Sequence, residues 1–197
     1  MEKEKATTEQ TADLIIGLYE KYGDEDYIGE PVSQVEHMCQ CATLAEEAGC
    51  SDDIILAAFF HDIGHLCEHI MPVTQMDGYG VVDHEKLGAD FLLSHGFTGS
   101  IASLVRNHVQ AKRYLTFSDQ AYYDRLSTAS KKTLEFQGGR MTAEEAASFR
   151  ADPLFEMHIR LRQWDEKAKL EEKQLPPLSK YRKMIVDHLS KKSGAVV

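Results

Sequence analysis

The chain has 197 residues, of which 43% are hydrophobic and 27% charged. This composition is typical of a folded protein and argues against disorder, and the length fits one domain with a sizeable core. The net charge of −10, without a compensating cluster of lysine and arginine, argues against a nucleic acid as partner. A small anionic substrate is still compatible with it, because a local pocket can be positive on an acidic protein.

The N-terminus and the cysteines bear on where the protein works. The first residues, MEKEKATTEQT, are polar and mixed in charge, unlike a signal peptide. The longest apolar run, 54–60, is far shorter than the roughly 20 residues of a membrane span. The four cysteines form no CxxC pair, which favours free thiols in a reducing compartment. We therefore expect a cytoplasmic protein that has no membrane partner. A monomer is expected, with an oligomer as the alternative.

Helical signals follow one another along the chain. Apolar residues recur at helical spacing in successive segments, most of which begin at a capping residue and end at a glycine. A polar tail is expected at about 1–8, and loops at 23–31 and 68–82. Helices are predicted at about 9–22, 33–48, 51–64, 83–95, 99–112, 118–125, 128–136, from 142, 152–170 and 179–191.

Capping residues set several of these boundaries. Ser33 with Glu36, and Thr142 with Glu145, have the capping-box pattern, in which each side chain satisfies a free backbone N–H of the other residue. Asp83 is expected to cap the helix that follows it.

Three further residues define the ends and faces of helices. Leu14 is expected on the buried side of the first helix, Gly23 at its end, and Pro153 in the first turn of the long helix. No stretch alternates as a strand does, and no internal repeat is found. We therefore predict an all-α fold, one irregularly packed helical domain across residues 1–197.

The string AAFFHDIGHL, residues 57–66, carries a histidine and an aspartate into an apolar segment. An unpaired buried carboxylate is costly, so such groups are usually ion-paired or bound to metal. A structural ion pair at a helix end is one interpretation. Metal ligation is the other, and it requires more histidines and carboxylates elsewhere in the chain.

Such residues recur on the other predicted helices. His108 shares the buried side of its helix with Leu104, while His37 lies at or beside an apolar face, where a core histidine is the alternative. Four imidazoles and two carboxylates exceed the needs of one metal ion and suit two metals bridged by a carboxylate. Without thiolates, the set suits iron, zinc or manganese. The candidate ligands are His37, His61, Asp62, His84, His108 and Asp165.

The remaining histidines are less informative. His69, His95 and His188 are expected at the surface, whereas His158 either supports the site or is exposed. His61 and His65 have the spacing of the zinc-protease HExxH motif, but an aspartate replaces the glutamate and a glycine weakens the helix. A protease is therefore disfavoured.

In this order, the candidate ligands resemble the metal signature of the HD-domain family in its two-metal form. Longer strings, DYIGEPVSQVEH, DGYGVVDHEKLGADFL, HVQAKRYL, SKKTLEFQGG and RQWDEKAK, resemble the mixed-valent diiron oxygenases of that family. The resemblance covers the chain from about Tyr19 to His188. It implies an Fe(II)/Fe(III) pair that uses O2 to split the C–P bond of a 1-hydroxyphosphonate. The substrate would be 2-amino-1-hydroxyethylphosphonate or its trimethylated analogue, and the products glycine or glycine betaine plus phosphate.

The same resemblance implies a role for each matching residue. One iron would be held by His37, His61 and Asp165, the second by His84 and His108, with Asp62 as the bridge. Tyr27 would block the iron that receives O2 until substrate arrives, and Glu30 would hold the substrate's ammonium. The phosphonate would be gripped by His65, Lys112, Ser130 and Arg162. Independently, Lys112 follows His108 by one helical turn and Arg162 precedes Asp165 by one, so both cations converge on the ligands.

Two alternatives stay open. The HD signature alone is typical of a phosphohydrolase acting on a small phosphate ester or nucleotide, and a regulatory module without activity is a weaker possibility. The intact set of six ligands argues against the regulatory module. The segment with Tyr27 and Glu30, and the strings around Lys112 and Ser130, favour the oxygenase over the hydrolase. The acidic run 24–26, together with Tyr22, Tyr27 and Tyr79, favours the trimethylated substrate, because a quaternary ammonium prefers aromatic faces and diffuse negative charge.

Overall fold

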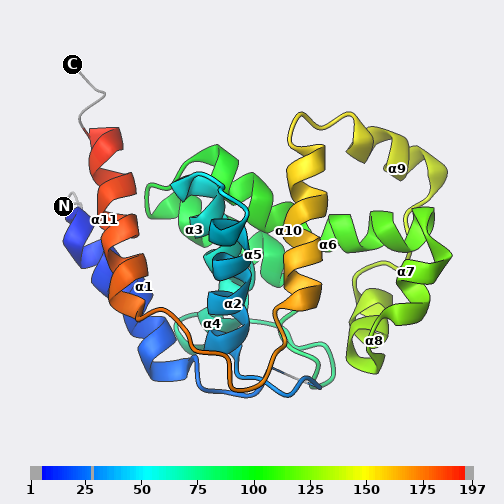
Figure 1. Cartoon of the computed structure of the whole chain (residues 1–197), viewed down its shortest axis with the longest axis horizontal. Coiled ribbons are helices and arrows are strands. Elements are labelled where there is room, and N and C mark those ends of the chain that lie inside the picture. Colours follow the sequence, from blue (N-terminus) through cyan, green and yellow to red (C-terminus); the bar gives the residue numbers. More distant parts are fainter. Residues whose placement is uncertain (1–5, 28, 194–197) are drawn as a thin grey trace.

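A computed structural model describes residues 6–27 and 29–193, and in this part of the chain helices joined by loops make up the whole fold, without a β-sheet (Figure 1). The all-α prediction is confirmed. None of the described helices is long and apolar enough to cross a membrane. The helices are α1 (Thr8–Tyr22), α2 (Gln34–Glu47), α3 (Asp52–Phe60), α4 (Ile63–Leu66), the 3-10 turn η1 (Cys67–His69), α5 (His84–Ser94), α6 (Gly99–Ser118), α7 (Gln120–Arg125), α8 (Thr128–Phe136), α9 (Ala143–Arg150), α10 (Phe155–Lys167) and α11 (Leu178–Ser193).

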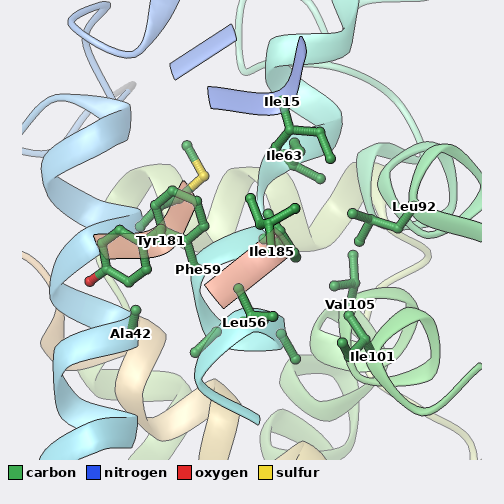
Figure 2. Packing of buried hydrophobic residues seen from close by; sticks show 14 of the residues in the cluster. Ile15, Ala42, Leu56, Phe59, Ile63, Leu92, Ile101, Val105, Tyr181 and Ile185 are labelled. Carbon is green, nitrogen blue, oxygen red and sulfur yellow. The ribbon is translucent and has the colours of Figure 1, made fainter. Parts of the chain in front are cut away.

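Helix α3 is the centre of the main hydrophobic core. Its residues 55–60 are all buried, as expected of a helix that is apolar on every side. Helices α2, α6 and α11 pack around it. Figure 2 shows Tyr181 of α11 beside Phe59, and the two rings stack with centroids 4.1 Å apart. From α1, Tyr19 donates a 2.8 Å hydrogen bond to the Phe59 carbonyl.

A second, smaller cluster supports the other end of the long helix α6. It consists of Ala111, Met141, Ala146 and Phe149, which join α6 to α9. Helix α6 therefore runs from the main core out to α7, α8 and α9 (Figure 1). The four cysteines are free, as predicted.

Both predicted capping boxes are present, at Ser33 and Glu36 and at Thr142 and Glu145. The boundary predicted at 152–153 is wrong. Asp152 Oδ1 accepts a 2.7 Å hydrogen bond from the Leu154 N–H and closes a turn, so α10 begins only at Phe155. Helix α6 is longer than predicted and continues to Ser118.

Of three further expectations, the one for Leu14 fails, the one for Asp83 holds only in part, and the one for Gly23 is confirmed. Leu14 is 44% exposed, because α1 turns Ile15 and Ile16 inward. Asp83 occupies the N-cap of α5, but its backbone is left-handed (φ 52°) and its side chain makes no cap hydrogen bond. Gly23 ends α1 in a right-handed conformation. A Cβ there would lie 2.4 Å from the Tyr19 carbonyl oxygen, so close packing requires this glycine.

Candidate metal centre

His61 and Asp62 lie at a break between two helices. Helix α3 ends at Phe60, Asp62 leaves the helical conformation (φ −105°, ψ 11°), and α4 resumes at Ile63. Next in α4, a Cβ on Gly64 would lie 1.9 Å from the His84 carbonyl oxygen. The sequence suggested that Gly64 weakens a helix, but its main effect is to let α5 approach the break closely.

Asp62 stands between two pairs of histidines. Its Oδ2 lies 3.5 Å from His37 Nε2 and 3.4 Å from His61 Nε2, while its Oδ1 lies 3.3 Å from His84 Nε2 and 3.2 Å from His108 Nε2. The structure therefore forms two groups that can each hold a metal ion, and they share this one carboxylate. All five side chains are buried.

Asp165 completes the first group. Its Oδ1 lies 3.4 Å from His37 Nε2 and is buried without a hydrogen-bond partner among the described residues. Its Oδ2 accepts a hydrogen bond from Arg162. An orphaned carboxylate oxygen in a buried place is costly, so Oδ1 has the setting of a metal ligand.

The orientation of the imidazoles also fits metal ions. Each Nδ1 faces a backbone carbonyl, at 2.9 Å for His37, 2.8 Å for His61, 3.3 Å for His84 and 2.7 Å for His108. A carbonyl only accepts, so each Nδ1 carries the proton and each Nε2 presents a lone pair. The Nε2 atoms of His37 and His61 are 3.0 Å apart, and those of His84 and His108 are 3.1 Å apart. Facing lone pairs at this distance need a cation between them, either a proton or a metal ion.

The charges around both carboxylates favour their ionised forms. Burial alone would raise the pKa of Asp62, but His61, His108 and His84 outweigh it and hold the pKa well below its usual range. Burial likewise acts to raise the pKa of Asp165, but the Arg162 guanidinium and His37 outweigh it and hold this pKa well below its usual value. Both carboxylates are therefore available as anionic ligands at neutral pH.

A cavity of about 160 Å³ opens onto one side of this centre. Among its lining residues are His84 and His108, together with both carboxylates, whereas His37 and His61 lie behind them. The predicted substrate residues Tyr27, Glu30, His65, Lys112, Ser130 and Arg162 all line it as well. The structure thus brings the six candidate ligands and these six residues together at one place.

Two buried cations line the cavity. Lys112 is 3% exposed, and its Nζ donates to Thr133 Oγ1 at 2.7 Å and to Gln137 Oε1 at 2.9 Å, both neutral groups. Burial and the nearby Arg162 lower the pKa of Lys112 well below its ordinary value. Arg162 differs, because it pairs with Asp165 and Glu166 and also donates to Ser130 Oγ at 3.3 Å.

His65 is arranged as a neutral donor. Its ring stacks on His84 with centroids 4.1 Å apart, and its Nδ1 accepts a 3.2 Å hydrogen bond from the Val81 N–H. Burial and the neighbouring His84 lower the pKa of His65 to about 3. A neutral imidazole that accepts at Nδ1 carries its proton on Nε2, where it can donate.

The loop before α2 places two residues at the cavity. The Tyr27 ring stacks on His37, with centroids 4.0 Å apart and planes at 13°. Glu30 Oε1 accepts from Ser127 Oγ at 2.8 Å and from Lys169 Nζ at 2.7 Å. The sequence pattern contained no signal for Lys169, because its partner lies 139 positions away. Tyr79 also lines the cavity, whereas Tyr22 stacks on His69.

Sequence analysis also missed polar residues that line the cavity. Gln34 lies one helical turn before His37, and its Oε1 is buried without a partner among the described residues. Thr133 and Gln137 lie one and two helical turns after Ser130. Helical spacing from a predicted site residue is the signal that could have found all three.

The other histidines correct one expectation and decide another. His188 is buried, not exposed, and its Nδ1 lies 2.9 Å from Asp53 Oδ1. His158 is also fully buried and stacks on Phe149, so it is not exposed and does not line the cavity. His69 and His95 are half-buried.

A helical fold around a buried histidine–aspartate centre defines the class of the protein. Residues 35–157 match the family model described as HD domain. This range contains five of the six candidate ligands, and Asp165 lies beyond it.

Three relatives match most of the chain. The uncharacterized protein L432 of Acanthamoeba polyphaga mimivirus is 44% identical over 187 residues, 95% of this chain and 85% of the relative. The 1-hydroxy-2-(trimethylamino)ethylphosphonate dioxygenase (glycine-betaine-forming) of Leisingera caerulea is 39% identical over 183 residues, which are 93% of this chain and 92% of the relative. The hydroxymethylphosphonate dioxygenase of Gimesia maris is 35% identical over 173 residues, which are 85% of this chain and 84% of the relative. The chain belongs to the HD-domain family and, within it, to the group of the phosphonate dioxygenases.

Proposed function

We propose that this protein is a diiron dioxygenase that uses O2 to cleave the C–P bond of a 1-hydroxyphosphonate. The observation that carries the proposal is Asp62, whose two oxygens face two histidine pairs beside a cavity that contains the buried Lys112. The names of two relatives support it, since both are phosphonate dioxygenases. The proposed substrates are 1-hydroxy-2-(trimethylamino)ethylphosphonate and its primary-amine analogue, converted to glycine betaine or glycine plus phosphate.

In this proposal six side chains hold two iron ions as a mixed-valent Fe(II)/Fe(III) pair. His37, His61 and Asp165 would hold the ion behind the cavity, His84 and His108 the ion that faces it, and Asp62 would bridge them. When bound, the ions would supply Lewis acidity toward the substrate hydroxyl and electrons for O2. The imidazole and carboxylate donors without thiolate suit iron.

The cavity side chains would bind and orient the phosphonate. Lys112 bonds to two neutral groups in the described structure, so an anionic oxygen would supply the countercharge that it lacks. Ser130 and the guanidinium of Arg162 lie beside it, and His65 can donate its Nε2 proton. Held by these groups, the phosphonate would direct its hydroxyl-bearing carbon toward the side of His84 and His108.

Tyr27 would control access to the centre. Its ring covers His37, and burial, Asp62 and Asp165 raise the pKa of its hydroxyl well above the usual value. The hydroxyl therefore keeps its proton. We propose that Tyr27 shields the centre until the substrate displaces it.

Oxygen consumption tests the proposal most directly. The chain would be loaded with Fe(II) without oxygen, partly oxidised, and mixed with each hydroxyphosphonate while O2 uptake and phosphate release are measured. We expect one phosphate per O2 consumed, and a coupled S = 1/2 signal in electron paramagnetic resonance that shifts on adding substrate. Lys112→Met should lose turnover, with Lys132→Met, an exposed lysine, as the matched control. Phosphate release from phosphate esters without oxygen, and none from hydroxyphosphonates, would instead establish a phosphohydrolase.

A further inference from the structure

Glu30, the residue expected to hold a substrate ammonium, already has a cationic partner. Lys169 Nζ lies 2.7 Å from Glu30 Oε1, and the two side chains are only 15% and 11% exposed. The same oxygen also accepts from Ser127. A shielded ion pair of this kind is stronger than one on the open surface, because water screens it less.

The backbone around Lys169 is fixed on both sides. Before it, the Ala168 carbonyl accepts a 2.9 Å hydrogen bond from His37 Nδ1. After it, Leu170 exchanges two hydrogen bonds with the side chain of Gln40, at 2.9 and 3.0 Å. Both partners belong to α2, so the stem of Lys169 is attached to the helix that carries a candidate metal ligand. Its ammonium is thereby kept beside two residues that line the cavity, Glu30 and Tyr27, and lies 5.8 Å from the centre of the Tyr27 ring.

The charge of Glu30 is consequently cancelled by its partner. Glu30 and Lys169 sum to zero, and a substrate ammonium would have to share Glu30 with a cation that repels it. Asp26 and Glu68 also line the cavity, but Asp26 is exposed and Glu68 is hydrogen-bonded to Gln75. A neutral substituent meets no such repulsion.

We propose that Lys169 sets the discrimination between 1-hydroxyphosphonates with a cationic substituent and those with a neutral one. It acts through Glu30 and is a positioning residue, since it controls how much of that carboxylate is free to attract an ammonium. The proposal deepens the proposed function and rests on it. A purely structural role, in which the pair only fastens the loop, would affect all substrates alike.

The test compares two substrates that differ in the amine alone, 2-amino-1-hydroxyethylphosphonate and 1-hydroxyethylphosphonate. We expect Lys169→Met in the iron-loaded full chain to raise the ratio of their kcat/KM values, cationic over neutral, by about five- to tenfold. Lys169→Arg should keep the original ratio because it keeps the charge. Lys167→Met, an exposed lysine at the same helix end, is the matched control.

The same substitution made in a Glu30→Gln chain separates the effect of the charge from an effect on folding. In a Glu30→Gln chain the same Lys169→Met change should raise the ratio by less, because it removes the repulsion but frees no carboxylate. Lys169→Gln replaces Lys169→Met where the latter does not fold. Turnover of both substrates with an unchanged ratio in Lys169→Met would overturn this inference alone. Turnover of neither substrate by the unaltered chain would overturn the proposed function, and the inference with it.

Discussion

At the scale of single residues, Asp62 joins the two candidate metal groups, because each of its oxygens faces a different histidine pair. An amide keeps the shape of the side chain but offers only one oxygen and no charge. We therefore expect Asp62→Asn to fold and to bind one iron or none in place of two, with loss of turnover. Metal analysis after desalting measures this, with the exposed Asp90→Asn as the control. Two tightly bound irons in Asp62→Asn would contradict the bridge.

Tyr27 allows a different kind of test. Its ring covers His37, and the proposed shielding has two possible contributors, the ring and the hydroxyl. Tyr27→Phe keeps the ring and removes the hydroxyl. We expect the reduced iron centre of this variant to oxidise faster in air when no substrate is present, as followed by absorbance after rapid mixing. An oxidation rate equal to that of the unaltered chain would remove the shielding role.

His158 predicts how stability depends on pH. Burial lowers the pKa of His158 below its usual value, although Asp152 acts in the opposite direction. Below a pH of about 6.5 the unfolded chain therefore takes up a proton that the folded chain does not, and stability falls until the folded pKa is passed. His158→Phe should lose less stability between pH 7.5 and pH 5, as measured by urea unfolding of the metal-free protein.

The control for this variant keeps the imidazole. Phe149→Leu loosens the same contact without removing the titrating group, so its stability should drop with pH as in the unaltered chain. An equal pH dependence in His158→Phe and the unaltered chain would show that other groups dominate.

At the scale of helices, the approach of α5 to α4 depends on Gly64. A Cβ there would lie 1.9 Å from the His84 carbonyl oxygen, and backbone cannot yield as a flexible side chain can. Gly64→Ala should therefore destabilise the protein by about 3 kcal/mol or more and shift His84 away from Asp62. Gly17→Ala, in α1 with open space around it, should instead stabilise by about 0.5–1 kcal/mol. Denaturant unfolding of both variants checks the contrast, and a harmless Gly64→Ala would contradict it.

The helices also show what the sequence can and cannot predict. The capping boxes at Ser33 and Thr142 were predicted, because both partners of each box lie within one helical turn. The start of α10 was not, since the side chain of Asp152 closes a turn where a proline pattern favours a helix.

In the candidate site, too, some residues could be predicted from the sequence and others could not. The histidines and aspartates were found from their residue types and their order in the chain, which resemble a family signature. The pair of Glu30 and Lys169 joins residues 139 positions apart, and no local pattern encodes it. His188 was misplaced for the same reason, because the residues that it contacts, Asp53 and Phe97, lie far from it in the chain.

At the scale of the whole molecule, the centre is the place where most of the helices meet. Its ligand candidates come from α2, the break after α3, the start of α5, the middle of α6 and the end of α10 (Figure 1). Helix α3 is also the middle of the hydrophobic core. Metal ions bound there would therefore add direct bonds between elements that are held together by packing and a few hydrogen bonds, and the facing Nε2 lone pairs would no longer repel each other.

Metal binding should consequently stabilise the entire fold. A ligand that binds only the folded state contributes about 4 kcal/mol at a thousand times its Kd, and for a chain of this size 1 kcal/mol raises the Tm by about 2–4 °C. We expect anaerobic Fe(II) to raise the Tm of the metal-free protein by about 8–16 °C in calorimetry, and a chelator to reverse the change. Asp62→Asn should show a much smaller rise. An equal rise in this variant would mean that the ions bind elsewhere, and no rise in the unaltered chain would contradict a metal centre that joins these helices.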